Sequence, residues 1–141
     1  MILSNNKIYR VLDFSEYGIS FPYLFICDHA TNNIPNNLNY LGLSQRQLSS
    51  HICWDIGAKE LTVKLAQIFK CPCFFSNFSR LVIDPNRKKN SYDLIVSSQD
   101  GNNIPGNENL TESDLNNRFL YYLNYHKNLN AFIENCRKRN K

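Results

Sequence analysis

The chain has 141 residues, enough for one domain with a real hydrophobic core. Hydrophobic residues make up 43% and charged residues 20%, which is typical of a soluble globular protein and not of a disordered one. The net charge of +4 comes from Arg137, Lys138, Arg139 and Lys141, because the remaining basic residues balance the 12 acidic ones. The body of the chain has no basic stripe, so a nucleic-acid binder is not predicted.

Neither a membrane span nor a secretory signal is predicted. The sequence has no long apolar segment, and its first six residues lack the basic and apolar regions of a signal peptide. The cysteines form no C-x-x-C pair and sit among apolar residues, so we expect reduced, buried thiols in a cytoplasmic protein. The five cysteines are Cys27, Cys53, Cys71, Cys73 and Cys136.

The first third of the chain predicts two strands and a loop. Residues 7–14 alternate in part, which favours an edge strand or an extended arm. Residues 23–27 form an unbroken apolar run, which is typical of a strand buried on both faces. Residues 32–43 are rich in asparagine and contain proline and glycine, so we expect a loop there.

Two helices are predicted next. Ser44 and Gln47 have the spacing of a capping box, which predicts a helix that starts at Gln45 and ends near His51 or Trp54. Residues 55–70 have a strong helical periodicity, with Asp55 in the first turn, where the helix dipole favours a carboxylate. The apolar face of this second helix comprises Ile56, Leu61, Leu65 and Ile68, broadened by Val63 and Phe69.

Two further strands are predicted at residues 73–76 and 80–84, and a long polar segment, residues 85–110, follows them. Residues 92–96 within that segment could hold a short strand, and a segment of this length without regular structure is often functional. Strands that alternate with helices favour a largely parallel sheet. The predicted fold class is therefore α/β.

The last predicted helix is the longest, from Glu112 to about Arg137. Thr111 and Asp114 form a variant of the capping box at its start. One apolar stripe recurs at intervals of three or four residues, and a histidine on such a stripe is commonly a hydrogen-bonded core residue. The stripe comprises Leu115, Phe119, Tyr122, His126, Leu129, Ile133 and Cys136.

Polar side chains follow the strand at residues 23–27. Ligands of open α/β sheets bind beyond the carboxyl ends of the strands, which would place Asp28 and His29 at the mouth of a crevice. His29 and Asn32 are spaced so that one tight turn could direct both toward a single point, and a neutral imidazole is a plausible zinc ligand. The alternative is that Asp28 caps the turn and His29 is only a hydrogen-bonded turn residue.

The predicted strand at residues 80–84 is also flanked by polar groups. Arginine binds a carboxylate through a planar two-point contact, and a neighbouring amide can add a donor, so Asn86 and Arg87 suit an acidic small molecule. The alternative is a surface ion pair of Asp84 with Arg80 or Arg87. Together with the groups around His29, these residues supply the types needed for metal-assisted amide hydrolysis. The set comprises Asp28, His29, His51, Asp55, Arg80, Asp84, Asn86, Arg87 and His126.

Five strings occur in order over residues 27–129: Cys-Asp-His-Ala-Thr-Asn-Asn-Ile-Pro, His-Ile-Cys-Trp-Asp-Ile-Gly-Ala, Ser-Arg-Leu-Val-Ile-Asp-Pro-Asn-Arg, Asp-Gly-Asn-Asn-Ile-Pro-Gly-Asn and Tyr-His-Lys-Asn-Leu. With them the chain closely resembles the N-formylglutamate amidohydrolase family. The resemblance implies a single domain over residues 1–141 with a three-layer α/β/α fold, a mostly parallel sheet like that of phosphorylase/hydrolase proteins, and a distant relationship to zinc carboxypeptidases. It also implies hydrolysis of N-formyl-L-glutamate to formate and L-glutamate.

The resemblance also implies roles for individual residues. His29 resembles the first zinc ligand, and its partner is Asn32 or Asp55; Asp55 is preferred because a carboxylate binds zinc better than a neutral amide. Asn86 and Arg87 resemble the pair that grips the substrate carboxylate, with Arg80 as a further contact and Asp84 beside them. The catalytic candidates are Asp28, His51 and His126.

One departure from the family pattern affects the predicted activity. Family members continue past the last helix, into a strand that ends in His-Ser-Phe-Thr-Pro and an acidic segment near Glu-Ile-Arg. We therefore expect a domain truncated after the long helix, which a second polypeptide would complete. The alternative is a catalytically inactive remnant, or a small module that binds carboxylates.

Overall fold

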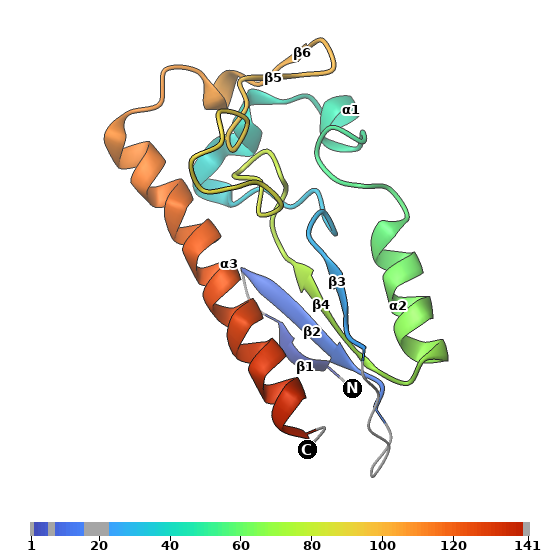
Figure 1. Ribbon diagram of the computed structural model, residues 1–141. Coiled ribbons are helices and arrows are strands. Elements are labelled where there is room, and N and C mark those ends of the chain that lie inside the picture. Colours follow the sequence, from blue (N-terminus) through green and yellow to red (C-terminus); the bar gives the residue numbers. More distant parts are fainter. Residues whose placement is uncertain (1, 6–7, 16–22, 140–141) are drawn as a thin grey trace.

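The computed structural model describes residues 2–5, 8–15 and 23–139 (Figure 1). Lys7, at the start of the first predicted strand, and Lys141, in the basic tail, lie outside the described residues. The elements in chain order are β1 (Ile2–Asn5), β2 (Tyr9–Asp13), β3 (Phe25–Cys27), η1 (Asn36–Gly42), α1 (Gln45–Leu48), α2 (Ala58–Ile68), β4 (Pro72–Ser76), β5 (Ser98–Gln99), β6 (Asn102–Asn103), η2 (Pro105–Asn107) and α3 (Glu112–Arg139).

The main sheet is mixed, with the strand order β1-β2-β4-β3. β3 runs parallel to β4, whereas β1 and β2, and β2 and β4, are antiparallel pairs. The prediction of a mostly parallel sheet is therefore not confirmed. The link between β1 and β2 is too short for a parallel crossover, which needs about a dozen residues or more, so these strands can pair only as a hairpin.

The strands differ from the prediction in three further ways. β2 is not an edge strand, because β1 and β4 pair with its two sides. β3 lies at the end of the strand order, and Ile26 within it is 42% exposed, so this strand is not buried on both faces. Residues 80–84 and 92–96 form turns and irregular backbone instead of strands.

The irregular segment at residues 80–84 is buried because other parts of the chain satisfy its backbone groups. Asn107 Nδ2 donates to the carbonyl of Leu81 at 2.8 Å, and Arg118 Nη1 donates to the carbonyl of Val82 at 2.9 Å. The backbone N–H of Asp84 donates to the carbonyl of Leu94 at 2.9 Å. Buried backbone groups need such partners, and here side chains take the place of a neighbouring strand.

The helices begin close to where their capping residues predict. The capping box of Ser44 and Gln47 is formed, although α1 has only four residues. The Thr111–Asp114 box is formed as well, with the Asp114 N–H donating to Thr111 Oγ1 at 3.2 Å. α2 begins at Ala58, three residues later than Asp55, because Gly57 before it has a φ of 84° in the left-handed region.

The apolar face predicted for the second helix is largely exposed. Ile56, Leu61 and Ile68 are 64%, 58% and 72% exposed. The side of α2 that packs on the sheet carries Ala58, Val63 and Ala66, of which Val63 alone belongs to the predicted face. The periodicity identified a helix but not the side that another element covers.

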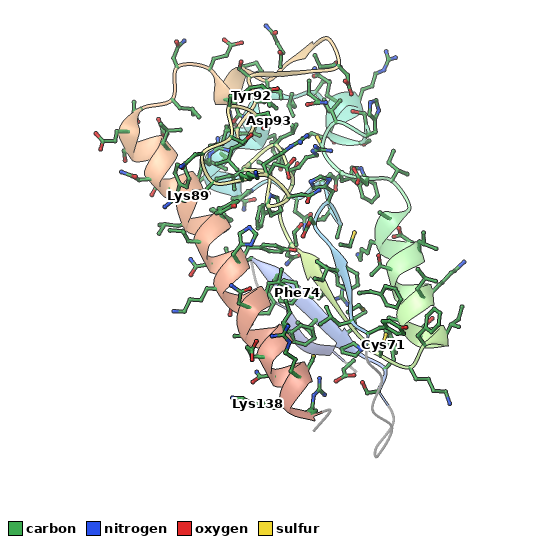
Figure 2. All side chains as sticks on the ribbon, viewed as in Figure 1. Cys71, Phe74, Lys89, Tyr92, Asp93 and Lys138 are labelled. Carbon is green, nitrogen blue, oxygen red and sulfur yellow. The ribbon has the colours of Figure 1, made fainter. Side chains whose placement is uncertain are left out.

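The hydrophobic core lies on both faces of the sheet. Phe74 packs between the sheet and α3, in edge contact with Tyr125, and the larger core cluster surrounds this contact. On the opposite face, Cys73 and Phe75 pack with Ala66 of α2. Figures 1 and 2 show the loops that follow β3 and β4 at the end of the sheet beside the first turns of α3.

Candidate functional site

The end of β3 delivers His29 into the protein interior. The strand ends at Cys27, and the His29 ring two residues later is 7% exposed. Its backbone carbonyl accepts a 3.0 Å hydrogen bond from the N–H of Asp55, so the turn before α2 is fixed beside it. The parallel pairing of β3 and β4 brings the segment after β4 to the same end of the sheet.

The carboxylate of Asp84 contacts several other residues that the sequence predicts to be functional. Its Oδ1 accepts from His29 Nε2 at 2.8 Å and from the backbone N–H of Asn86 at 2.9 Å. Its Oδ2 accepts from Arg80 Nη2 at 2.9 Å and lies 3.7 Å from Arg87 Nε. Burial works against the charged form, but the hydrogen bonds from His29 and Asn86 and the charge of Arg80 hold the pKa of Asp84 below its usual value.

The His29 ring lies between two carboxylates. Its Nε2 must donate to Asp84, because an ionised carboxylate can only accept. Its Nδ1 lies 3.3 Å from Asp55 Oδ2, so a neutral ring would present a lone pair toward a second carboxylate. Such an arrangement is favourable only when a proton or another cation lies between the two atoms.

The arginines occupy the other side of Asp84. Arg80 reaches both Asp84 and Asp55, with its Nη1 3.6 Å from Asp55 Oδ1, so the predicted ion pair of Asp84 with Arg80 is present. Arg87 is 45% exposed, and its Nε lies 3.1 Å from Asp93 Oδ2. A cavity of about 50 Å³ lies here, much smaller than the 300–1,000 Å³ of a typical ligand pocket. It is lined by Arg80, Leu81, Asp84, Arg87, Asp93, Val96 and Gln99.

α3 holds the segment that carries Asp84 through side-chain donors. Arg118 Nη1 donates to the carbonyl of Val82, His126 Nε2 lies 3.0 Å from that of Pro85, and Tyr122 Oη donates to that of Arg87 at 2.8 Å. These three side chains lie four residues apart on one helix face. Tyr122 and His126 belong to the predicted apolar stripe and Arg118 does not, and an apolar stripe gives no sign that polar atoms on it bind a loop.

Three of the predicted catalytic residues lie outside the hydrogen-bonded network around Asp84. Asp28 Oδ1 accepts from the hydroxyl of Tyr125, and burial raises the pKa of that phenol far above its ordinary value, so it remains a donor. His51 is exposed and pairs with Asp100 at 3.0 Å. His126 binds a backbone carbonyl, as a core histidine would. Their catalytic roles stay predictions.

The two predicted amides have different surroundings. Asn32 Nδ2 donates to the carbonyl of Leu48 at 2.8 Å, which ties the turn after β3 to α1. The side chain of Asn86 is exposed, and its backbone N–H binds Asp84. Asn32 as a zinc ligand and Asn86 as a carboxylate donor therefore stay predictions.

The residues around His29 fit a zinc ion in part. The 3.3 Å between His29 Nδ1 and Asp55 Oδ2 equals the separation of two ligands on one tetrahedral zinc, about 3.3 Å for bonds of about 2.0–2.1 Å. Asp84 on the other ring nitrogen is the usual partner of a metal-binding histidine. Within residues 2–5, 8–15 and 23–139, however, no group of three or more His, Cys, Asp or Glu side chains is arranged to hold a metal.

The cysteines are free and buried, as predicted. Burial raises the pKa of Cys53 to about 11 and that of Cys73 to about 12, so both thiols stay protonated at neutral pH. A second cavity, of about 530 Å³, is lined mainly by asparagines and by none of the predicted site residues. Across the described residues, no helix has the length and apolar character that a membrane span requires.

Comparisons with known proteins show the family of the chain. The family model for N-formylglutamate amidohydrolase matches residues 21–141. The crystal structure of gene product Atu2144 from Agrobacterium tumefaciens superimposes with a TM-score of 0.85 at 30% sequence identity. The match covers 96% of this chain and 53% of that one, so the chain spans about half the length of this solved relative. No curated protein matches the sequence. The resemblance expected from the five motifs is confirmed, and the chain belongs to the N-formylglutamate amidohydrolase family.

Proposed function

We propose that the chain forms the carboxylate-binding part and half of the metal site of a hydrolase that converts N-formyl-L-glutamate and water to formate and L-glutamate. One observation carries the proposal: the Asp84 carboxylate binds His29 on one side and both predicted substrate-binding arginines on the other. A metal ion can polarise the scissile carbonyl of an N-acyl amino acid while a neighbouring group binds the substrate carboxylate.

His29 and Asp55 would hold the zinc ion, which when bound supplies a Lewis acid and lowers the pKa of a water molecule. Asp84 fixes the His29 ring so that Nε2 carries the proton and Nδ1 presents its lone pair. Arg80 balances the charge of Asp55 and Asp84 from the opposite side.

Arg87, with Asn86, would bind a substrate carboxylate, and Arg80 would make a second contact. Binding in this orientation directs the formyl carbonyl toward His29, and water then replaces the amide nitrogen at that carbon. The amide nitrogen leaves with a proton as the amine of glutamate. We propose that a second polypeptide segment, outside the 141 residues, supplies the third metal ligand and the general base.

A carboxylate-binding module without catalysis is the second candidate. One feature favours it: the described residues offer an incomplete donor set for zinc. In this case Arg87 would still bind glutamate-like ligands, but no formate would be released.

Formate release from N-formyl-L-glutamate separates the two candidates. The chain would be assayed with zinc, alone and mixed with a second polypeptide that carries the His-Ser-Phe-Thr-Pro strand and the acidic segment, and His29→Ala would be the matched variant. We expect turnover only in the mixture and only with His29 present. Turnover by the chain alone at ordinary enzyme rates, about 1–1000 per second, would contradict the need for a second polypeptide. Binding without turnover in the mixture would favour the module.

A further inference from the structure

The guanidinium of Arg87 is held at one of its three nitrogens. Its Nε lies 3.1 Å from Asp93 Oδ2 and 3.7 Å from Asp84 Oδ2. Among the described residues, Asp84 and Asp93 are the acidic residues that form ion pairs with Arg87. The same guanidinium lines the small cavity, together with Gln99 of β5. Its terminal nitrogens therefore remain for a ligand.

Asp93 is itself fixed by its neighbours. The hydroxyl of Ser91 donates to Asp93 Oδ1, and the N–H of Leu94 donates to the carbonyl of Ser91 at 3.2 Å. Leu94 is 5% exposed within the core, and its carbonyl accepts from the N–H of Asp84 at 2.9 Å. The turn that carries Asp93 is thus attached directly to the residue that binds His29 and Arg80.

We propose that Asp93, supported by Ser91, is a positioning residue that holds Arg87 by Nε so that its two terminal nitrogens bind a substrate carboxylate end-on. The inference rests on the carboxylate-binding role of Arg87 in the proposed function. A guanidinium presents five N–H groups in a fixed plane, and the engagement of Nε leaves the four terminal ones, of which two are parallel. These two match the two oxygens of a carboxylate.

The advantage is pre-organisation and not added charge. An arginine side chain has many rotamers, and ordering them when the ligand binds would weaken the complex. Asp93 orders the side chain beforehand, although its own negative charge opposes an anionic ligand. If Asp93 acts only through its charge, its removal should strengthen ligand binding. If Asp93 positions Arg87, its removal should weaken ligand binding, so the sign of the change separates the two.

The first test observes Arg87 directly. In the ¹⁵N-labelled full chain, the Nε–Hε signal of Arg87 is assigned by its loss in Arg87→Lys. We expect this signal to shift in Asp93→Ala and to shift less in Ser91→Ala, because Nε lies in an ion pair with Asp93. Tyr92→Ala is the matched control, because Tyr92 lies between the two residues and is 97% exposed (Figure 2). A signal that Asp93→Ala leaves unchanged would overturn the proposal.

The second test measures the binding of N-formyl-L-glutamate by calorimetry. We expect about tenfold weaker binding in Asp93→Ala, an intermediate loss in Asp93→Asn, whose amide oxygen still accepts a hydrogen bond, and no change in Tyr92→Ala. Equal or tighter binding in Asp93→Ala would overturn the positioning role alone. A wild-type chain that binds no N-formyl-L-glutamate would overturn the carboxylate-binding role of Arg87 and, with it, this inference.

Discussion

Asp84 is the residue on which the arrangement of the site depends. It is 4% exposed and accepts hydrogen bonds from an imidazole, a guanidinium and a backbone N–H. A buried carboxylate is stable only when such partners replace water. The side chain that orients His29 is therefore also the one that places both arginines, which makes the metal side and the substrate side of the site interdependent.

Asp84→Asn tests this dependence. Removal of one partner from a buried charged network leaves the others unpaired, and we expect the free energy of unfolding to fall by about 3 kcal/mol in urea titrations at pH 7. The folded pKa of Asp84 is lower than its unfolded value, near 3.8, so its contribution is complete above about pH 5 and is lost as the pH falls through the folded pKa. A difference between wild type and variant that does not shrink as the pH falls below about 3.8 would contradict the assignment.

Arg87→Ala separates a binding role from a structural one. Arg87 is 45% exposed and contributes a surface ion pair with Asp93, so we expect the thermal midpoint to move by less than about 4 °C. Loss of a charged two-point contact should weaken the binding of N-formyl-L-glutamate about 10- to 100-fold. Lys88→Ala is the exposed neighbouring control. Unchanged binding with a large loss of stability would assign Arg87 to a structural ion pair.

At the scale of elements, α3 and a buried irregular segment take the place of the strand predicted at residues 80–84. Arg118 is 3% exposed and donates to the carbonyls of Val82 and Gly106 at 2.9 and 3.2 Å. The apolar run Leu81-Val82-Ile83 is typical of a strand, and the structure buries it without forming one. Its conformation was not predictable, because the donors that replace a strand lie about 35 residues away in α3.

Arg118→Met should destabilise the protein more than any polar change on the exposed side of α3. Two buried carbonyls would lose their donor while the side-chain volume is roughly kept, and we expect a loss of about 3 kcal/mol in urea unfolding. Asn130→Ala, at an exposed position of the same helix, is the control and should change stability by less than about 0.5 kcal/mol. Equal effects of the two variants would show that Arg118 does not support the segment.

Gly106, the second glycine of the motif Asp-Gly-Asn-Asn-Ile-Pro-Gly-Asn, lies in close contact with the backbone of η1. A Cβ at this position would lie 2.6 Å from the Leu41 Cα, so the backbone of η1 would have to move. We expect Gly106→Ala to cost about 1–3 kcal/mol, measured by thermal unfolding. Gly101→Ala, where a Cβ meets nothing within 4 Å, should cost only the 1–2 kcal/mol of a left-handed φ. A neutral Gly106→Ala would contradict the close approach.

At the scale of the whole molecule, sequence motifs identified more than sequence periodicity did. The motifs placed His29, Asp55, Arg80, Asp84 and Arg87 in one family site, and the structure brings these residues together. Periodicity found both long helices, but it did not show that the sheet is mixed or that Leu61 and Ile68 on α2 are exposed. The direction of a strand within the sheet and the side of a helix that other elements cover both depend on distant parts of the chain. For the same reason, the residues next to Asp93 and Arg118 in the sequence do not reveal the roles of these two side chains.

The most direct test of the site is ¹H–¹⁵N chemical-shift mapping of the chain during titration with N-formyl-L-glutamate. We expect the largest changes at His29, Asp55, residues 80–87, Asp93 and Gln99, and we expect Arg87→Ala to abolish them. Shift changes centred on the larger asparagine-lined cavity, near Asn36, Asn77 and Tyr121, would contradict it, as would the absence of any change at millimolar ligand.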